Sequence, residues 1–399
     1  MLRGARQYLL RQPSEDGQHP VTFVELFFDL VFVFAITQLS RHLLHDLSVV
    51  GLVQTLILFV ALWWAWIDTA WVTNWLDPER KPVRLMLLAL MLIGLILSAS
   101  LTKAFHEGAM TFALAYGAFQ TGRSAFTIWA VARHDPPQAM NFVRILSWQG
   151  VAFALWIAGA LGHDGLRLGL WAAAVTVESI GPTLGFPVPG LGRSKATDWK
   201  LESGHLAERC GLFIIIALGE SILVTGATFS GLAWRGQSWT ATGWASFLVA
   251  FTSSLAMWWI YFDTGSDRAA ARFAQTSRTG AMARLGYTYV HQVIVIGIIG
   301  YAVSDELVLA HPGGDVSAAA AAVIIGGPAF YVLGCGLFKY PVLSRFPLSH
   351  MAGLALLLLL VPFTSFFNPI GLAAAATLVL LVVAAWETVA LRLLEKPAE

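Results

Sequence analysis

Two clusters of ionisable residues lie inside long apolar runs of this 399-residue sequence. The first cluster is Glu25 and Asp29, which are four residues apart and therefore share one face of a helix. The second cluster is His205, Glu208 and Arg209. Carboxylates attract cations, and an arginine beside them changes their affinity for protons. If these apolar runs span a membrane, as the composition below indicates, charges inside them are costly unless they are paired or hydrated. Both clusters are therefore candidates for a functional site.

Further polar residues extend both helix faces. Thr37 follows Glu25 and Asp29, and Glu220 follows Arg209. Two such faces are expected to look toward each other or toward a shared cavity, where they would carry a cation or protons. The alternative is that the charges form buried structural ion pairs that set the register of the helices. The residues by themselves leave both interpretations open.

Arg123 and His291 belong to two other polar helix faces. Arg123 is the only Lys or Arg well inside a predicted helix, so we expect it to pair with a carboxylate, either Asp29 or Glu178. For His291 we favour a hydrogen bond within the helix bundle over a role in proton shuttling.

The composition indicates that most of the chain lies in lipid. Hydrophobic residues make up 57% of it and charged residues 12%, whereas a soluble protein has about 25% charged residues. A membrane-spanning helix needs about 20 mainly apolar residues. About twelve segments meet this requirement, at 21–43, 48–68, 82–103, 108–132, 140–162, 165–187, 203–229, 240–263, 284–303, 316–339, 347–366 and 369–393. We therefore predict an all-α integral membrane protein.

A short motif indicates that the chain contains an internal repeat. Residues 63–68 read Trp-Trp-x-aromatic-x-Asp, and residues 258–263 repeat the pattern. Its last residues, Asp68 and Asp263, are expected near the cytoplasmic ends of their helices, where snorkelling or pairing with a loop arginine is the simpler explanation. The Gly- and Pro-rich polar break from Gly185 through Lys200 divides the chain near its middle.

These features predict two parallel six-helix repeats. Most Lys and Arg residues lie on the side of the two chain ends, so both termini are expected to be cytoplasmic. The predicted organisation is a cytoplasmic tail (1–20), a first repeat (21–187), a cytoplasmic linker (188–202), a second repeat (203–394) and a tail (395–399).

Several classes of function find no support in the sequence. The net charge is +1 and no basic stripe is present, which argues against a nucleic-acid partner. No pattern for a phosphate-binding loop, a dinucleotide site or a catalytic nucleophile occurs, so no enzyme activity and no cofactor is predicted. His42 and His45 have a spacing that suits a metal, but we interpret them as solvated loop residues and predict no metal site.

Three segments resemble the signatures of a known family. Residues 21–39 read VTFVELFFDLVFVFAITQL, residues 205–221 read HLAERCGLFIIIALGES, and residues 284–291 read RLGYTYVH. They resemble the bacterial low-temperature-requirement A (LtrA) family, and the likeness spans essentially the whole chain. The resemblance implies a multi-pass protein of the bacterial cytoplasmic membrane.

Residues 28–37 are also similar, more distantly, to the Phe-Ser-Asp signature of a potassium and proton channel family that is built from six-helix repeats. The first helix of each repeat lines the pore in that family. The resemblance therefore implies that the predicted helices at 21–43 and 203–229 line a path. Phe28 replaces the serine of the signature, and the helix at 203–229 lacks the triplet.

The favoured prediction is a transporter or channel for a cation or protons, with the helices at 21–43 and 203–229 along the path. One alternative is a membrane-embedded enzyme or lipid-binding protein, whose polar faces would bind a headgroup or an isoprenoid. Another is a non-catalytic membrane factor. The lipid bilayer is the expected partner, the ligand is a small cation, a proton or a lipid, and the oligomeric state is left open.

Overall fold

The computed structural model describes residues 9–11, 20–195, 202–234, 240–262 and 284–395. Apart from two isolated β-bridges, every regular element in these residues is helical. The chain divides into two compact units. Unit 1 consists mainly of residues 1–42 and 49–209, and unit 2 mainly of residues 210–277 and 282–399.

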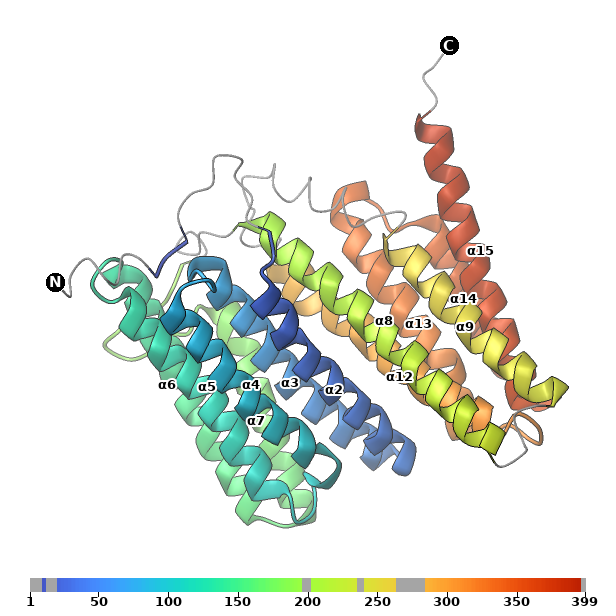
Figure 1. Cartoon of the computed structure of the whole chain (residues 1–399), viewed down its shortest axis with the longest axis horizontal. Helices are drawn as coiled ribbons and strands as arrows, with labels where there is room; N and C mark the ends of the chain where they lie inside the picture. Colours follow the sequence, from blue (N-terminus) through green and yellow to red (C-terminus); the bar gives the residue numbers. More distant parts are fainter. Residues whose placement is uncertain (1–8, 12–19, 196–201, 235–239, 263–283, 396–399) are drawn as a thin grey trace. The chain divides into compact units, whose positions relative to one another are not determined.

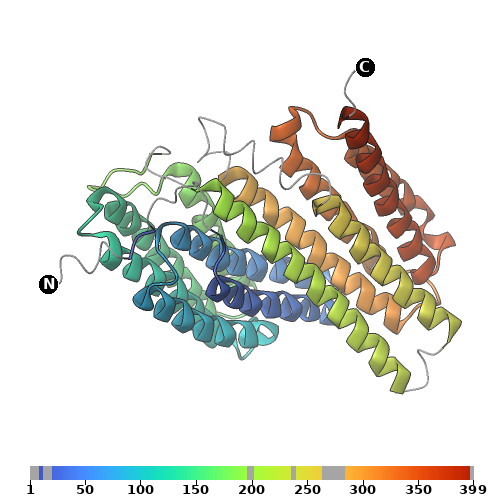
Figure 2. The same ribbon diagram turned by 45° about the horizontal axis from the view of Figure 1, so that its top comes forward.

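Unit 1 is a bundle of helices that lie alongside one another in both Figure 1 and Figure 2. In chain order they are α2 (Phe23–His45), α3 (Val49–Trp75), α4 (Lys81–Ser100) with the short η1 (Leu101–Lys103), α5 (Ala109–Val131), α6 (Pro136–Leu161) and α7 (Asp164–Leu184). The next helix, α8 (Ser203–Trp234), begins in unit 1, and the boundary between the units falls after Arg209.

Unit 2 contains the rest of α8 and the helices that follow it. These are α9 (Ala241–Phe262), the π-helical stretch η3 (Arg284–Val290), α12 (His291–Ala310), α13 (Ala318–Leu343), α14 (Leu348–Leu360) with the 3-10 helix η4 (Val361–Phe366), and α15 (Pro369–Glu395). The described residues thus hold twelve α-helices, which agrees with the number predicted.

Ten of the helical segments in the described residues are long and apolar enough to cross a membrane. The two predicted spans outside this group are α5 and α7, which are long enough but more polar. Arg123 lowers the apolar character of α5, and Arg167 and Glu178 lower that of α7. The chain is a multi-pass helical membrane protein.

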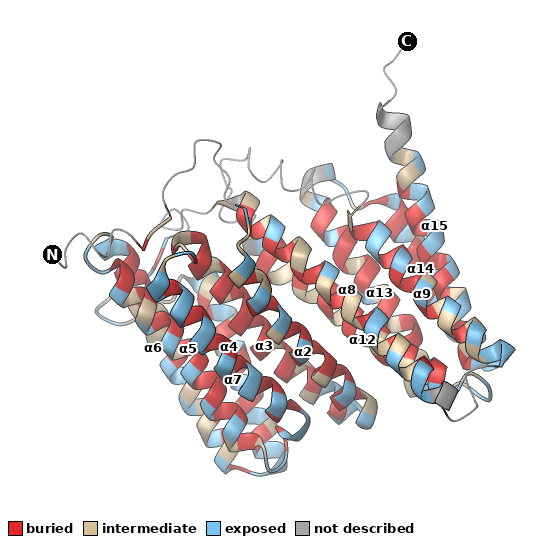
Figure 3. Cartoon of the chain, in the orientation of Figure 1, coloured by how far each residue is buried: buried red, intermediate tan, exposed pale blue. Residues whose placement is uncertain are grey.

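Surface leucines show how these helices meet lipid. The exposed side of α4 carries Leu85, Leu88, Leu92 and Leu95, spaced three and four residues apart. This spacing places them in one stripe along the helix. Figure 3 shows buried and exposed residues alternating in this way along the helices of each unit. A stripe of leucine without charges suits hydrocarbon rather than water.

Glycine permits close packing of α12 on α13. A Cβ atom added at Gly327 would lie 2.5 Å from the backbone nitrogen of Tyr301, and one added at Gly300 would lie 3.1 Å from the Cα of Gly327. Because lipid supplies little hydrophobic drive between helices, small residues that let backbones approach are a main source of helix association. These glycines therefore set the distance between the two helices.

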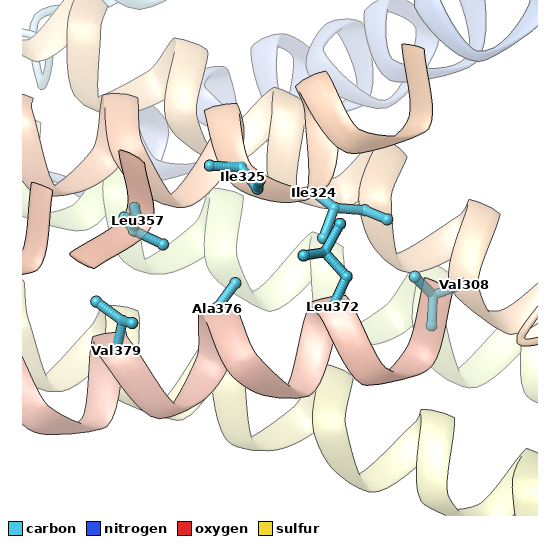
Figure 4. Close-up of a cluster of buried hydrophobic side chains, with 7 residues drawn as sticks. All are labelled: Val308, Ile324, Ile325, Leu357, Leu372, Ala376 and Val379. Atoms are coloured by element: carbon cyan, nitrogen blue, oxygen red, sulfur yellow. The ribbon is translucent and has the colours of Figure 1, made fainter. Parts of the chain in front are cut away.

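An apolar cluster joins four helices of unit 2. It consists of Val308 on α12, Ile324 and Ile325 on α13, Leu357 on α14, and Leu372, Ala376 and Val379 on α15 (Figure 4). In a membrane protein such a cluster stabilises the bundle chiefly through van der Waals contacts.

The two units have the same order of helix packing. In unit 1, α5 packs on α4 and α6, while α7 packs on α6 and α3. In unit 2, α13 packs on α12 and α14, while α15 packs on α14 and α9. Counted along each half of the chain, α5 and α13 are both the fourth helix, and α7 and α15 are both the sixth.

Some helix ends differ from the predicted ones. The second helix was predicted to end at residue 68, but α3 continues to Trp75 because Trp71 and Val72 prolong its apolar run. The predicted span 347–366 is α-helical only to Leu360. Pro362 lacks a backbone N–H, and the chain continues from Val361 as a tighter 3-10 helix.

Candidate functional site

Glu25 lies in the first turn of α2, and the local sequence explains its position. Thr22-x-x-Glu25 is the capping-box pattern, in which the glutamate bonds back to the N–H group that precedes the helix. The backbone N–H and the hydroxyl of Thr22 donate to Glu25 Oε2 at 2.9 and 2.8 Å. The carboxylate also lies at the positive end of the helix dipole. Its other oxygen, Oε1, bonds to residues of α8.

Arg209, near the start of α8, bridges the two carboxylates of α2. Its Nη1 donates to Glu25 Oε1 at 3.0 Å and to Thr73 Oγ1 at 3.2 Å, and its Nη2 donates to Asp29 Oδ1 at 2.6 Å. The side chains of Arg209, Glu25 and Asp29 are all 0% exposed. One guanidinium reaches both carboxylates because they are one helical turn apart.

Asp29 accepts hydrogen bonds through only one of its two oxygens. The indole Nε1 of Trp66 on α3 donates to Oδ1 at 2.7 Å, the same oxygen that binds Arg209. Oδ2 is buried and has no hydrogen-bond partner among the described residues. The Trp66 ring also lies 5.8 Å from the Arg209 guanidinium carbon, a cation–π contact. Asp29 thus combines a short ion pair with one unsatisfied acceptor.

Asn74 determines which nitrogen of His205 carries the proton. Its amide is held by the backbone of Glu202: Nδ2 donates to the Glu202 carbonyl at 2.8 Å, and Oδ1 accepts from the Glu202 N–H at 2.9 Å. The same Nδ2 lies 3.3 Å from His205 Nδ1, which must therefore be an acceptor. In the neutral ring the proton is then on Nε2, which donates to Glu25 Oε1 at 3.1 Å.

The segment Leu9–Arg11 lies against the end of α3 and brings a second arginine to Glu25. The Arg11 N–H donates to the Trp75 carbonyl at 2.9 Å, and the Asp77 N–H donates to the Leu9 carbonyl at 2.8 Å. Arg11 Nε donates to the Thr73 carbonyl at 2.7 Å, and Nη2 lies 3.3 and 3.4 Å from the two oxygens of Glu25. The backbone pairing thus places this guanidinium at the carboxylate.

We call this group of residues the Glu25 cluster. Its members are Arg11, Glu25, Asp29, Trp66, Thr73, His205 and Arg209. With His205 neutral, two carboxylates face two guanidinium groups, so the formal charges balance. All the members belong to unit 1.

The structure brings together four of the predicted site residues, Glu25, Asp29, His205 and Arg209. From the sequence, Arg11 was expected in the cytoplasmic tail at residues 1–20, and neither Trp66 nor Thr73 was predicted as a site residue. Nothing distinguishes Arg11 from the other tail arginines, because its place depends on a backbone bridge to α3. Trp66 belongs to the repeated motif at residues 63–68, and this motif was the feature of the sequence that could have identified Trp66 as a site residue.

The other predicted members of the two helix faces lie outside the cluster. Glu208 is exposed, and its Oε2 accepts from the Val21 N–H at 3.1 Å, just before α2 begins. The Thr37 hydroxyl donates to the Val33 carbonyl of its own helix at 3.3 Å. Glu220 is half-buried on the part of α8 that belongs to unit 2.

The comparisons with known proteins concern nearly the full length of the chain. Residues 20–385 match the family described as bacterial low temperature requirement A protein (LtrA). The chain belongs to this family. It is similar to an uncharacterized protein of Rhizobium meliloti (strain 1021), with 42% identity over 394 residues that cover 98% of this chain and 94% of the relative. No solved structure matches.

A second polar group of this LtrA-family protein lies between α3 and α5. Arg123 Nη2 donates to Asp68 Oδ2 at 3.0 Å, and Nη1 donates to the Ala65 carbonyl at 3.1 Å and to Thr69 Oγ1 at 3.3 Å. The prediction that Arg123 pairs with a carboxylate is confirmed, but the partner is Asp68 rather than Asp29 or Glu178. Because α3 continues beyond residue 68, Asp68 lies inside the helix, opposite Arg123, rather than at its end.

Glu178 on α7 has a different environment. The Tyr116 hydroxyl on α5 donates to Glu178 Oε2 at 2.7 Å, and Gln120 Nε2 donates to the Tyr116 oxygen at 3.0 Å. The glutamate is buried, with 9% of its surface exposed. Within the described part of the chain, its carboxylate forms no ion pair.

Unit 2 of the LtrA-family protein has a buried ion-pair group of its own. Lys339 Nζ on α13 donates to Glu387 Oε2 on α15 at 2.6 Å and to the Ile260 carbonyl on α9 at 2.9 Å. His350 Nδ1 on α14 lies 3.3 Å from Glu387 Oε1. Lys339 lies near the predicted end of its helix and was not predicted as a site residue from the sequence.

Two further buried histidines, His291 and His42, lie outside the Glu25 cluster. His291 is buried; its Nδ1 lies 2.8 Å from the Gly286 carbonyl, and its Nε2 lies 2.8 Å from the Tyr261 hydroxyl. His42 is buried and stacks on Phe105, with ring centroids 6.4 Å apart, so its interpretation as a solvated loop residue was wrong. Asp263 lies outside the described residues.

Proposed function

We propose that this LtrA-family protein is a secondary transporter for a cation or protons, and that the Glu25 cluster couples ion binding to helix movement. The unsatisfied Asp29 Oδ2 beside the Arg209 ion pair carries the proposal. A buried acceptor without a partner costs about 1–3 kcal/mol. An ion pair that served only to join helices would be expected to satisfy both oxygens. The open acceptor is instead a place for a proton or a cation to bind.

The charge balance of the cluster supports the same function. Its two carboxylates are matched by two guanidinium groups, and Glu25, Asp29 and Arg209 have no exposed surface. A proton on Asp29 or an added cation would leave a net positive charge in this buried group. Because an uncompensated buried charge is costly, binding would weaken the hold of α2 on Arg209. Ion binding and helix separation would then be linked.

The packing of the cluster favours a carrier over a permanently open channel. Both carboxylates are 0% exposed and are bonded to groups of the protein itself. A channel that selects cations with acidic side chains keeps those side chains along its pore. A carrier, by contrast, alternates between states in which the same groups are closed off and accessible.

The proposed architecture is a duplication of a six-helix unit, with α2 and α8 as the first helices of the two parallel repeats. The shared order of helix packing in the two units supports it. The repeated motif at residues 63–68 and 258–263 supports it as well. The distribution of Lys and Arg supports a bacterial cytoplasmic membrane orientation with both termini inside the cell.

The proposal is tested with purified protein in liposomes under a potassium, sodium or pH gradient. We expect the wild type to move at least one of these ions. Asp29→Asn should reduce the flux about tenfold or more, because the amide can neither take up a proton nor balance Arg209. The readout is dye fluorescence for each ion.

Glu107→Gln is the control for this experiment. Glu107 is exposed on the loop before α5, and the hydrogen bond from Lys103 holds the pKa of its carboxyl below the usual range. Its replacement should leave the flux unchanged. The proposal is wrong if no ion moves under any of the three gradients, or if Asp29→Asn transports as well as the wild type.

A further inference from the structure

The guanidinium of Arg11 reaches the Glu25 cluster from a segment outside the helices. Leu9–Arg11 is joined to the end of α3 by an isolated antiparallel bridge between Leu10 and Leu76, which consists of two backbone hydrogen bonds. A bridge of this length is a weak attachment compared with a helix, whose hydrogen bonds form cooperatively. Arg11 is therefore the member of the cluster that can leave without the unfolding of a helix.

The groups around Arg11 form a site for a cation with N–H donors. The Thr73 carbonyl accepts from Arg11 Nε at 2.7 Å, and both oxygens of Glu25 face Nη2. The Arg11 side chain is 7% exposed, and Glu25 is 0% exposed. A carbonyl and a carboxylate that together face one planar guanidinium provide acceptors in the geometry that this group requires.

Arg11 is held less favourably than Arg209. Its Nη2 lies 3.3 and 3.4 Å from the Glu25 oxygens, whereas Arg209 reaches Glu25 at 3.0 Å and Asp29 at 2.6 Å. Arg11 Nη2 also lies 2.9 Å from His205 Nε2, the nitrogen that carries the proton when Nδ1 accepts from Asn74. Two donors then face each other, which is unfavourable. The backbone bridge holds Arg11 in this position, with long contacts to Glu25 and a close contact to the protonated nitrogen of His205.

We propose that Arg11 is a tethered occupant of a binding site for small guanidinium-type cations at the start of α2, formed by Glu25 and the Thr73 carbonyl. A free guanidinium would replace the Arg11 side chain when the segment Leu9–Arg11 detaches. The existence of this binding site does not depend on the proposed transport function. Its role in receiving a transported substrate rests on the proposed function, and it would define the substrate class as a planar cation with several N–H donors.

Chemical rescue of Arg11→Ala tests the site. The full-length variant is purified in detergent, and its thermal unfolding is followed by tryptophan fluorescence at constant ionic strength while guanidinium chloride is added at low millimolar concentration. We expect a saturable rise of about 2–4 °C in the unfolding midpoint of Arg11→Ala. The wild type should show no rise, because its own Arg11 fills the site.

Arg80→Ala is the matched control. Arg80 forms an arginine–carboxylate pair with Asp77 at 2.9 Å, close to the same end of α3, but its side chain is 27% exposed. Guanidinium should not stabilise this variant. Tetramethylammonium, which has the charge but no N–H donor, should not stabilise Arg11→Ala. An equal response to tetramethylammonium, or equal responses of Arg80→Ala and Arg11→Ala, would overturn the proposal.

Arg11→Lys covers the case in which Arg11→Ala does not fold. The lysine ammonium keeps the charge but lacks the planar fork, so it satisfies the site incompletely. Guanidinium should still stabilise this variant, by less than it stabilises Arg11→Ala. If neither variant responds, the site does not exist. Because the assay needs no ion gradient, a rescue without any flux of potassium, sodium, protons or guanidinium in liposomes would reject the transport function and retain the binding site.

Discussion

Unit 1 and unit 2 each bury a cation from the fourth helix of their half against the second helix, but the acidic residues that lie beside it in the described part of the chain differ. Arg123 on α5 donates to the Ala65 carbonyl at 3.1 Å, and Lys339 on α13 donates to the Ile260 carbonyl at 2.9 Å. Ala65 and Ile260 hold the same place in the repeated Trp-Trp-x-aromatic-x-Asp motif. The place of the cation is thus common to both units.

Within the described residues, the two counter-ions lie on different helices. Arg123 pairs with Asp68 on α3, whereas Lys339 pairs with Glu387 on α15. Glu178 lies on α7, the last helix of unit 1, as Glu387 lies on α15, the last helix of unit 2, but Glu178 accepts from the Tyr116 hydroxyl rather than from a cation. The Asp68 side chain is 30% exposed and that of Glu387 is 9% exposed. Among the described residues, the two buried cations thus have acidic partners on different neighbouring helices; Asp263, which holds the place of Asp68 in the motif, lies outside these residues.

The largest expected effect is that of Lys339→Met. It would remove the ion-pair partner of the buried Glu387 carboxylate, and removing one partner of such a pair costs about 3–5 kcal/mol. Equilibrium unfolding in mixed micelles should show this loss. A loss below about 1 kcal/mol would mean that the Lys339–Glu387 pair is not held in the way the structure indicates.

Arg123→Met should destabilise the protein less than Lys339→Met does. The Asp68 side chain is 30% exposed, against 9% for Glu387, so its carboxylate is less completely buried when the cation is absent. We expect a loss of about 1–3 kcal/mol in the same unfolding assay, mainly from the hydrogen bonds to Ala65 and Thr69. The comparison between the units would be broken if Arg123→Met proved the more damaging of the two substitutions.

The smallest effects are expected at Glu178. Tyr116→Phe removes its hydrogen bond and should cost about 1 kcal/mol. Glu178→Gln should be nearly neutral, because the amide oxygen still accepts from Tyr116. Glu387→Gln is the matched substitution in unit 2, and it should cost more because it removes the negative charge from the buried Lys339–Glu387 ion pair. Equal effects of the two glutamine variants in unfolding experiments would contradict the different roles of these glutamates.

Helix positions could be predicted from the sequence because a bilayer imposes a length and an apolar composition on each span. The predicted helix at 108–132 and α5 (Ala109–Val131) agree to within a residue at each end. The ends that failed depend on local effects that a composition window does not detect. In α14 the cause is the missing N–H of Pro362, and in α3 it is an apolar run that continues beyond the required length.

The candidate site was predictable only for residues that lie on helices. The spacing of Glu25 and Asp29 places both on one face of α2, and the matching face at the start of α8 provides His205 and Arg209. Asp68 was assigned to a helix end and Arg123 to another carboxylate, because spacing along one helix does not determine which residue of a second helix lies opposite. Roles in transport remain predictions for all the residues of the cluster.

The sequence by itself determined the membrane setting, the helices and the faces that carry charge, since hydropathy and the 3.6-residue period act locally along the chain. Only the tertiary structure decided the partners: Arg209 with both carboxylates of α2, Arg11 at Glu25, and Arg123 with Asp68. Ion pairs between helices depend on the rotation and depth of each helix, and these follow from the packing of the whole bundle rather than from any one segment.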